Sequence, residues 1–187
     1  MSKWQKYYED TKSKPPAKLL VEALSFVDNK VRALDLGSGA LVDSKYLLSL
    51  GFEVVAVDQE NYAEEIVDDK FRFICSSFAD YQFPQDSFNL INAQFSLPFH
   101  GQDAFEMLWK RIIAALKHNG VFVGQFFDLN DEWNVDETKL IFHSKNQIES
   151  LLKGLEVLKL VEIEKDGVLA NGKTKHWHTF HVIVRKN

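Results

Sequence analysis

The sequence predicts an α/β fold: a three-layer sandwich in which a mostly parallel, seven-stranded sheet ends in an antiparallel C-terminal hairpin. Two observations predict it. Five short apolar runs alternate with helical segments, as in parallel strands joined by crossover helices. Two longer strand-like runs then follow each other without a helix between them. No linker or internal repeat interrupts the 187 residues, so we expect a single domain over 1–187.

Two helical segments are predicted before the first strand. Trp4 and Tyr8 lie four residues apart, which places both rings on one face of a short helix. Pro15-Pro16 ends this segment and opens a second helix over roughly 17–27. We interpret residues 1–15 as an N-terminal lid over a bound ligand, an interpretation compatible with packing of the first helix on the body.

The central motif follows directly. The apolar run Val31 to Leu36 stops at Gly37-Ser38-Gly39, and a helix over 43–50 comes next. This order predicts a strand, a glycine turn and a helix, in which backbone N–H groups can approach a ligand closely. The second strand, 53–57, ends in Asp58, about 20 residues after the glycines, which suits a carboxylate that binds ribose hydroxyls. The motif predicts a nucleotide-like cofactor.

The remaining elements are predicted from periodicity and breaker residues. Helical turns are expected over 61–67, a third strand over 71–75 with Cys75 as a buried strand-end thiol, and a loop over 76–86. A fourth strand over 88–95, an amphipathic helix over 103–116 capped by Asn119-Gly120, and a fifth strand over 121–127 follow. After an irregular segment over 128–140 come a helix to about 152, with Ser144 capping over Gln147, and hairpin strands over 156–165 and 173–185, with Asp166-Gly167 and Asn171-Gly172 in the turn.

Composition limits the class of protein. The chain is 45% hydrophobic and 26% charged, as in a soluble globule. A net charge of −5 provides no general surface for nucleic acid, and no run reaches the roughly 18 apolar residues of a membrane span. The N-terminus lacks the apolar core of a signal peptide. We expect a cytoplasmic monomer or homodimer with no nucleic-acid or membrane partner. Fifteen Phe and four Trp suggest that some aromatic residues line a pocket.

DLGSGA after a strand, an acid that ends the next strand and a terminal hairpin together resemble the Rossmann-like S-adenosylmethionine-dependent methyltransferases. Nicotinamide-binding domains share the first two features but expect a third glycine, and Ala40, Leu41 and Val42 follow Gly39 here. The resemblance covers about residues 16–185. NAQFSLPFHG, VGQFFDLNDEW and KHWHTFHVIVRK are similar to small bacterial methyltransferases often labelled tellurite-resistance-like, most of which have no assigned substrate.

The resemblance implies a set of cofactor contacts. Gly37, Ser38 and Gly39 would cradle the methionine end of S-adenosylmethionine, and Asp35 would lie under its amino group, directly or through water. Asp58 would accept hydrogen bonds from both ribose hydroxyls, and Gln59 would lie beside the adenine. The family usually has an acid after the third strand that binds the adenine amino group. That position is Ser77 here, so either Ser77 with Phe78 or the more distant Asp80 serves. Gln94 would point towards the cofactor.

The acceptor residues are predicted from the loops. Ser96-Leu97-Pro98-Phe99 stands where adenine- and glutamine-methylating enzymes carry an Asn/Asp-Pro-Pro-aromatic motif, which disfavours that chemistry. Candidate substrate residues are Trp4, Tyr8, Phe99, His100 and Trp133. No catalytic residue is assigned. His100 is a weak candidate for a general base, because methyl transfer from a sulfonium needs mainly proximity and orientation.

No metal site is predicted. His176 and His178 share one face of a strand, His181 points the other way, and no acid at ligand spacing accompanies them, so a structural role is favoured. The main hypothesis is a methyltransferase for an unidentified small molecule that releases S-adenosylhomocysteine. The alternatives are a methyltransferase for a protein or RNA partner, a non-catalytic S-adenosylmethionine-binding module and, less favoured, a nicotinamide oxidoreductase.

Overall fold

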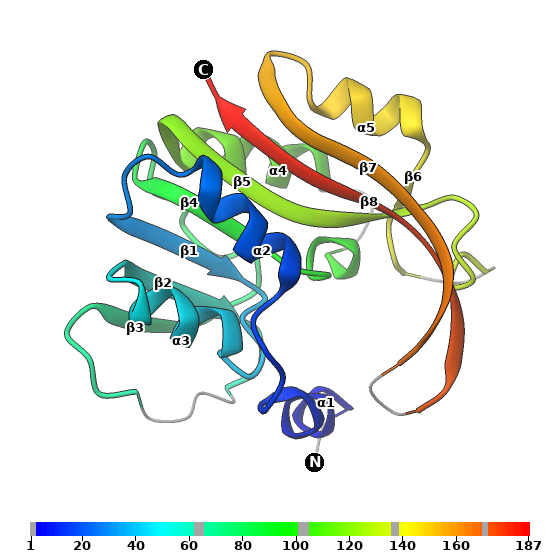
Figure 1. Ribbon diagram of the computed structural model, residues 1–187, viewed down its shortest axis with the longest axis horizontal. Helices are drawn as coiled ribbons and strands as arrows, with labels where there is room; N and C mark the ends of the chain where they lie inside the picture. The colour runs from blue at the N-terminus through cyan, green and yellow to red at the C-terminus, as the bar shows by residue number, and fades with distance from the viewer. Residues whose placement is uncertain (1–2, 62–65, 101–104, 136–138, 170–171) are drawn as a thin grey trace.

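The computed structural model describes residues 3–61, 66–100, 105–135, 139–169 and 172–187. One sheet runs through it in the order β3-β2-β1-β4-β5-β8-β7 (Figure 1). Its strands are β1 (Arg32–Leu36), β2 (Glu53–Asp58), β3 (Phe71–Cys75), β4 (Phe88–Ala93), β5 (Leu116–Asp128), β7 (Leu155–Val168) and β8 (Thr174–Lys186), and the two-residue β6 (Phe142–His143) pairs with β5. Strands β1 to β5 are parallel and β8 is antiparallel to both neighbours, which confirms the predicted fold class; β6 adds to the seven predicted strands.

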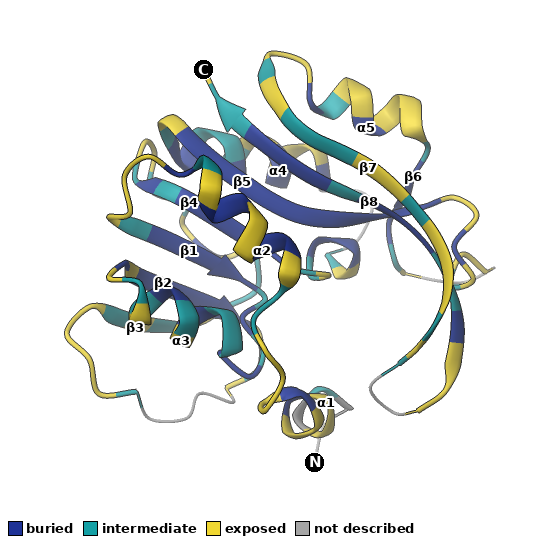
Figure 2. Cartoon of the chain, viewed as in Figure 1, coloured by how far each residue is buried: buried dark blue, intermediate teal, exposed yellow. Residues whose placement is uncertain are grey.

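Helices cover both faces of the sheet. On one face lie α2 (Lys18–Ala23) with the 3-10 turn η1 (Leu24–Phe26) and α3 (Val42–Ser49); on the other lie α4 (Phe105–Ala115) and α5 (Lys145–Leu151). Each pair buries its apolar side in its own core, while the outward sides of the helices stay exposed (Figure 2). The predicted Ser144 cap forms a complete capping box with Gln147. No described helix is long and apolar enough to cross a membrane.

The strand register gathers the predicted site at one edge of the sheet. Leu36 pairs with Val57, Asp35 with Asn92, and Asp58 with Cys75, so β1, β2, β3 and β4 end side by side. Ligands of α/β sheets bind outside the carboxyl ends of such strands. The helix α1 (Lys3–Thr11) and the far end of the β7–β8 hairpin both lie near this edge (Figure 1).

Two predicted turn signals lie inside strands instead. The helix α4 ends at Ala115, and Asn119-Gly120 belongs to β5 rather than capping the helix. Asn119 has φ +62°, and a Cβ on Gly120 would lie 2.9 Å from the carbonyl oxygen of Phe88. Asp166-Gly167 likewise lies within β7, opposite His176 and Lys175. Asn119-Gly120 lies at a bulge, because the pairing of β5 with β4 shifts register between Phe88–Leu116 and Leu90–Val121. Asp166-Gly167 is paired with β8, and this pairing overrides its local turn preference.

The predicted burial of Cys75 is wrong, and one predicted helical segment is only partly covered by the structure. Cys75 is exposed because β3 is an edge strand with a sheet neighbour on one side only. Its thiol lies 3.5 Å from the carbonyl oxygen of Gln59. Of the helical turns predicted over 61–67, residues 62–65 lie outside the described residues, and Asn61, Val67 and Ile66 are not helical.

Candidate functional site

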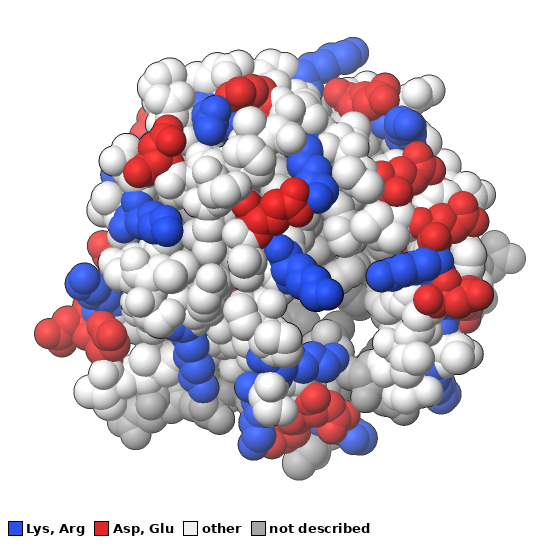
Figure 3. Space-filling view, viewed as in Figure 1, with Lys and Arg blue, Asp and Glu red and all other residues white. Residues whose placement is uncertain are grey.

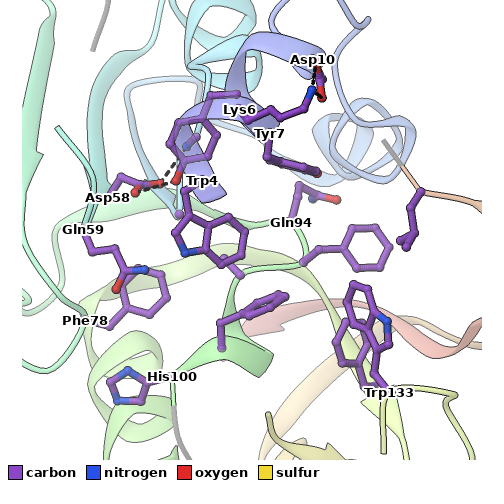
Figure 4. A pocket seen from close by; sticks show the side chains of 18 of the residues that line it. Trp4, Lys6, Tyr7, Asp10, Asp58, Gln59, Phe78, Gln94, His100 and Trp133 are labelled. Atoms are coloured by element: carbon purple, nitrogen blue, oxygen red, sulfur yellow. Dashed lines mark hydrogen bonds and ion pairs between the residues drawn. The ribbon is translucent and has the colours of Figure 1, made fainter. Parts of the chain in front are cut away.

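A cavity of about 1080 Å³ lies at the carboxyl edge of the sheet (Figure 4). Its walls come from the glycine turn, the ends of β2, β3 and β4, the helix α1, and the tip of the β7–β8 hairpin. Ligand pockets of proteins typically measure about 300–1000 Å³. The cavity is therefore large enough for a nucleotide-sized cofactor together with a second small molecule.

The glycine turn is shaped by two close approaches. Gly37 has φ +72° and Gly39 has φ +49°. A Cβ on Gly37 would lie 2.3 Å from the Cβ of Ser96, whose hydroxyl donates to the carbonyl oxygen of Leu36 at 2.7 Å. A Cβ on Gly39 would lie 3.3 Å from the ring of Tyr8. Because Gly37 has no side chain, the loop after β4 can pack against it. Because Gly39 has none, Tyr8 of α1 can pack against the turn.

Asp58, the last residue of β2, lies beside the glycine turn and is buried. One carboxylate oxygen accepts from the N–H of Gly39 at 2.9 Å; the other accepts from the N–H of Glu60 and from the hydroxyl of Tyr8, both at 3.0 Å (Figure 4). Burial and the charge of Asp58 raise the pKa of Tyr8, so its hydroxyl stays protonated and donates. Asp58 is therefore a fixed anionic acceptor that a ribose hydroxyl would share with Tyr8 or take from it.

The turn also contains a polar group with no partner. The Ser38 hydroxyl is buried and lacks a hydrogen bond among the described residues. An orphaned buried hydroxyl costs free energy unless a ligand or water completes it. The hydroxyl lies within the turn and does not line the cavity, so its missing partner is a feature of the turn and not a ligand contact shown here.

Asp35 is buried beneath the turn and does not line the cavity. It accepts from the Ser44 hydroxyl at 2.6 Å and from the Asn92 amide at 2.9 Å. The same Asn92 nitrogen donates to Asp43 at 3.1 Å, and Asp43 accepts from the N–H of Ala17 at 2.8 Å. Burial, followed by the nearby Asp43 carboxylate, raises the pKa of Asp35, and burial raises that of Asp43. Asp35 thus supports the turn from below.

We expect Asp35→Asn to flatten the pH dependence of stability. A carboxyl whose native pKa is raised binds its proton more strongly in the folded state, so its contribution to stability is lost as the pH rises from about 4 through the native pKa. An asparagine can still accept from Asn92 and can donate to Ser44. In urea unfolding between pH 5 and pH 8, the free energy of unfolding of the variant should increase relative to that of the wild type as the pH rises. Parallel profiles would contradict this, and the exposed Asp68→Asn serves as control.

A chain of amides connects this support to the cavity wall. The Gln94 amide donates to the Asn92 side-chain oxygen at 2.6 Å, and its own oxygen accepts from Gln125 at 2.6 Å. The Gln125 oxygen in turn accepts from the N–H of Phe95 at 3.0 Å. These bonds fix which end of the Gln94 amide faces each neighbour. One N–H and one lone pair of Gln94 remain for a ligand.

The loop after β3 forms another wall of the cavity. Ser77 lines the cavity and its hydroxyl donates to Asp80 at 2.6 Å, whereas Asp80 does not line it. Phe78 and His100 lie with ring centroids 5.9 Å apart on this side, near Gln59 and away from Trp133 (Figure 4). Burial and the charge of Arg111 lower the pKa of His100, so the ring is neutral at pH 7.

Aromatic side chains form the opposite wall. The cavity is lined there by Phe95, Phe99, Phe127, Trp133 and Trp177. Their ring centroids lie 5.5–6.3 Å from their neighbours, the spacing of packed aromatic pairs. Trp4 of α1 closes over Phe99 with a centroid distance of 5.2 Å.

Most of the predicted site residues meet in this cavity. Gly37, Gly39, Asp58, Gln59, Ser77, Phe78 and Gln94 line it from the predicted cofactor set. Trp4, Tyr8, Phe99, His100 and Trp133 line it from the predicted substrate set. Asp35 and Ser38 do not, because Asp35 lies beneath the turn and the Ser38 hydroxyl is buried in it.

The sequence analysis missed the contribution of the hairpin. None of the predicted site residues belongs to the C-terminal strands or their connection, but Val168, Leu169, Lys173 and Trp177 line the cavity. Strands β7 and β8 are 14 and 13 residues long and bend past the sheet, which brings their far end opposite α1 (Figure 1). Strand alternation was the available signal, because Trp177 must face away from His176 and His178.

The hairpin histidines do have acidic neighbours, contrary to the prediction from spacing. His178 Nε2 lies 2.8 Å from Glu162 and its Nδ1 lies 3.4 Å from Asp128, while His176 contacts Asp166 and Glu164 at 2.9 and 3.2 Å. These acids come from β5 and β7, where sequence spacing does not reveal them. Asp128, Glu162 and His178 lie close enough to hold a metal ion. His178 hydrogen-bonds to Glu162 through Nε2, whereas its buried Nδ1 lies beside Asp128 without a hydrogen bond to any described residue.

The fold and this site define a class. A glycine turn after the first strand, a buried acid at the end of the second and an antiparallel strand inserted beside the fifth are the features of the Rossmann-like methyltransferases. Residues 33–120 match the family model described as a methyltransferase domain. This part of the chain, which holds the glycine turn and Asp58, is therefore a methyltransferase domain by that match, and S-adenosylmethionine is the cofactor that such a domain implies.

Solved structures share the fold along most of the chain. TehB from Haemophilus influenzae is 15% identical with a TM-score of 0.76, covering 97% of this chain and 66% of its own. The 1,6-didemethyltoxoflavin-N1-methyltransferase of Burkholderia thailandensis, described with bound 1,6-didemethyltoxoflavin and S-adenosylhomocysteine, is 17% identical with a TM-score of 0.66, covering 97% and 84%. A methyltransferase from Methanosarcina mazei gives 16% and 0.69, covering 91% and 98%. The likeness to the tellurite-resistance-like group therefore holds at the level of the fold. No curated protein matches the sequence.

Proposed function

We propose that this methyltransferase transfers its methyl group to a small molecule and releases S-adenosylhomocysteine. The main support is the cavity. One end of it holds the residues proposed to bind the cofactor, the other end is lined by aromatic side chains, and α1 covers both. The bound 1,6-didemethyltoxoflavin described for the Burkholderia thailandensis enzyme of similar fold supports an acceptor of this size. On the face shown in Figure 3, Lys and Arg alternate with Asp and Glu, without the continuous basic surface that an RNA partner favours.

The cofactor contacts are assigned by this proposal. Gly37 to Gly39 hold the methionine end, and Asp35 keeps the turn in place from below. Asp58 accepts the ribose hydroxyls. Ser77 and Phe78 take the adenine side in preference to Asp80, because Asp80 does not line the cavity. Bound S-adenosylmethionine supplies a methyl carbon activated by its sulfonium.

Residues 1–15 act as the lid in this proposal, within a single domain over 1–187. Tyr8 is buried against Gly39 and Asp58, and Trp4 packs on Phe99, so α1 contacts both ends of the cavity. Covering the cavity excludes water and holds the acceptor in line with the methyl group, which is the main source of rate in such a transfer. Opening of α1 is then required for exchange of ligands.

No general base is assigned. His100 is neutral at pH 7, as a base must be, but it lies beside Phe78 on the side proposed for adenine (Figure 4). A proton lost by the acceptor therefore passes to water, which reaches the cavity when α1 opens. His100→Asn is expected to leave methyl transfer largely unchanged once the acceptor is identified.

A ligand comparison tests the proposal. We expect S-adenosylhomocysteine to raise the melting temperature of the purified protein and NAD to leave it unchanged, because ligands stabilise only the state that binds them. Protein with S-adenosylmethionine labelled on the methyl carbon, incubated with a metabolite extract freed of macromolecules, should then yield a labelled small product. Stabilisation by NAD alone would refute the cofactor assignment, and label found only in added RNA or protein would refute the small-molecule acceptor.

A further inference from the structure

Resting on the methyl transfer proposed above, we infer that the acceptor is a planar aromatic compound without a positive charge that stacks on the rings of Phe95, Phe99, Phe127, Trp133 and Trp177, called here the aromatic wall. The buried ammonium group of Lys175 positions this wall from behind. The inference depends on the packing of the rings, on the contacts of Lys175 and on the free hydrogen-bonding capacity of Gln94.

The wall is assembled from distant parts of the chain. Phe95 follows β4, Phe99 ends the 3-10 turn η2 (Leu97–Phe99), Phe127 lies in β5, Trp133 follows β5 and Trp177 lies in β8. Trp177 lies 5.5 Å from both Phe95 and Trp133, measured between ring centroids. All five side chains face one cavity. Such a surface binds a flat ring through stacking and burial of apolar area.

Lys175 lies on the protein side of this wall. Its side chain is fully buried, and its ammonium nitrogen lies 3.9 Å from the ring centroid of Trp177 and 4.5 Å from that of Trp133. Both oxygens of the buried Asp131 contact the same nitrogen, at 2.5 and 2.6 Å. Asp131 also accepts from the backbone N–H groups of Trp133 and His178, each at 3.0 Å. The ion pair therefore ties the loop of Trp133 to strand β8.

These contacts disfavour a positively charged acceptor. Aromatic faces attract cations, but the rings of Trp133, Trp177 and Phe127 already hold one on their buried side. A cationic acceptor would meet that ammonium through the rings. Among the described lining residues, the carboxylates are Asp58 at the glycine turn and Asp10, which is paired with Lys6 at 3.0 Å. Lys14 and Lys173 line the same cavity, so its lining does not disfavour a negatively charged substituent. A planar ring without a positive charge fits these conditions.

Gln94 supplies the polar contact. Its amide lies between Tyr7 and the rings around Trp133 (Figure 4), with one N–H and one lone pair free. It can hold a hydroxyl, amino or ring-nitrogen substituent of the acceptor. The lone pair of that heteroatom forms the new bond to the methyl carbon while the carbon–sulfur bond breaks with its electrons left on sulfur, and a proton carried by the heteroatom passes to water.

Two probes of similar shape test the inference: 2-naphthol, which is uncharged, and N-methylquinolinium, which is a cation. Each is titrated by calorimetry and by tryptophan fluorescence, with and without S-adenosylhomocysteine. Three of the four tryptophans, Trp4, Trp133 and Trp177, line the cavity and should report binding. We expect 2-naphthol to bind at least tenfold more tightly. Equal or tighter binding of N-methylquinolinium would overturn the inference.

Single substitutions distinguish binding at the aromatic wall from binding at the cofactor site. Trp177→Leu and Trp133→Leu should each weaken 2-naphthol at least fivefold and leave the affinity for S-adenosylhomocysteine within twofold. Tyr46→Leu, on α3 and away from the cavity, should change neither. Failure of S-adenosylhomocysteine to bind would count against the proposed function, whereas unchanged 2-naphthol binding in both tryptophan variants would count against the wall.

The role of Lys175 has its own readout. Lys175→Met combined with Asp131→Asn removes both buried charges together, which avoids leaving one of them unpaired. The preference for 2-naphthol over N-methylquinolinium should then fall towards one, because the rings no longer hold a cation. An unchanged preference in the folded double variant would remove Lys175 from the explanation. If this variant does not fold, the two tryptophan variants still decide the wall.

Discussion

Asp58→Ala is expected to weaken S-adenosylhomocysteine at least tenfold, and about a hundredfold if both ribose hydroxyls bind the carboxylate. A hydrogen bond to a charged group contributes roughly 1.5–3 kcal/mol, and about 1.4 kcal/mol corresponds to tenfold in affinity. The alanine also leaves the N–H of Gly39, the N–H of Glu60 and the hydroxyl of Tyr8 without their acceptor. Calorimetric titration with S-adenosylhomocysteine measures the effect.

Two further variants make this result specific. Asp58→Asn keeps the shape and one acceptor oxygen, and should fall between the wild type and the alanine variant. Asp68→Ala removes an exposed aspartate that accepts from the N–H of Lys70 in the turn before β3, and should leave the affinity unchanged within twofold. An unaltered affinity in Asp58→Ala, measured well below its melting temperature, would remove Asp58 from the ribose site.

Gly37→Ala is expected to be the most damaging small substitution in the turn. The new Cβ would lie 2.3 Å from the Cβ of Ser96 at a backbone φ of +72°. Left-handed backbone costs an L-residue roughly 1–2 kcal/mol, and a forced contact in a packed region adds about 1–3 kcal/mol. Chemical denaturation should show the loss of stability. Binding of S-adenosylhomocysteine should weaken as well, because Gly37 and Ser96 both line the cavity.

Two control variants separate the cost of the left-handed backbone from the cost of the contact with Ser96. Gly51 has φ +93° and open space around the position of a Cβ, so Gly51→Ala measures the backbone cost alone. In a Ser96→Gly background the clash is absent, and Gly37→Ala should then cost no more than Gly51→Ala does in the wild type. Equal effects of Gly37→Ala in the wild-type and Ser96→Gly backgrounds would show that the contact with Ser96 is not the cause.

Much of this protein could be predicted because its signals are local. The glycine turn, the acid that ends β2 and the capping box of Ser144 and Gln147 each depend on residues near one another in sequence. The strands follow from apolar runs, and their parallel order brings Asp58 and Gln94 to one edge. The predictions that failed involve turn residues and a thiol whose surroundings come from elsewhere. Asp166-Gly167 lies in a strand because β8 pairs with it, and Cys75 is exposed because β3 has one neighbour.

The sequence by itself determined the fold class, and it predicted the cofactor and the residues proposed to bind it, because the glycine turn and Asp58 lie within one strand–helix–strand unit. Only the tertiary structure decided the acceptor end. Trp177 and Lys175 reach the cavity because a long hairpin bends past the sheet, and Asp131 pairs with Lys175 across 44 residues. The glycine turn shows both sides of this division: its sequence predicts the cofactor, but Ser96 and Tyr8, which pack on its two glycines, come from segments that no local pattern connects to it.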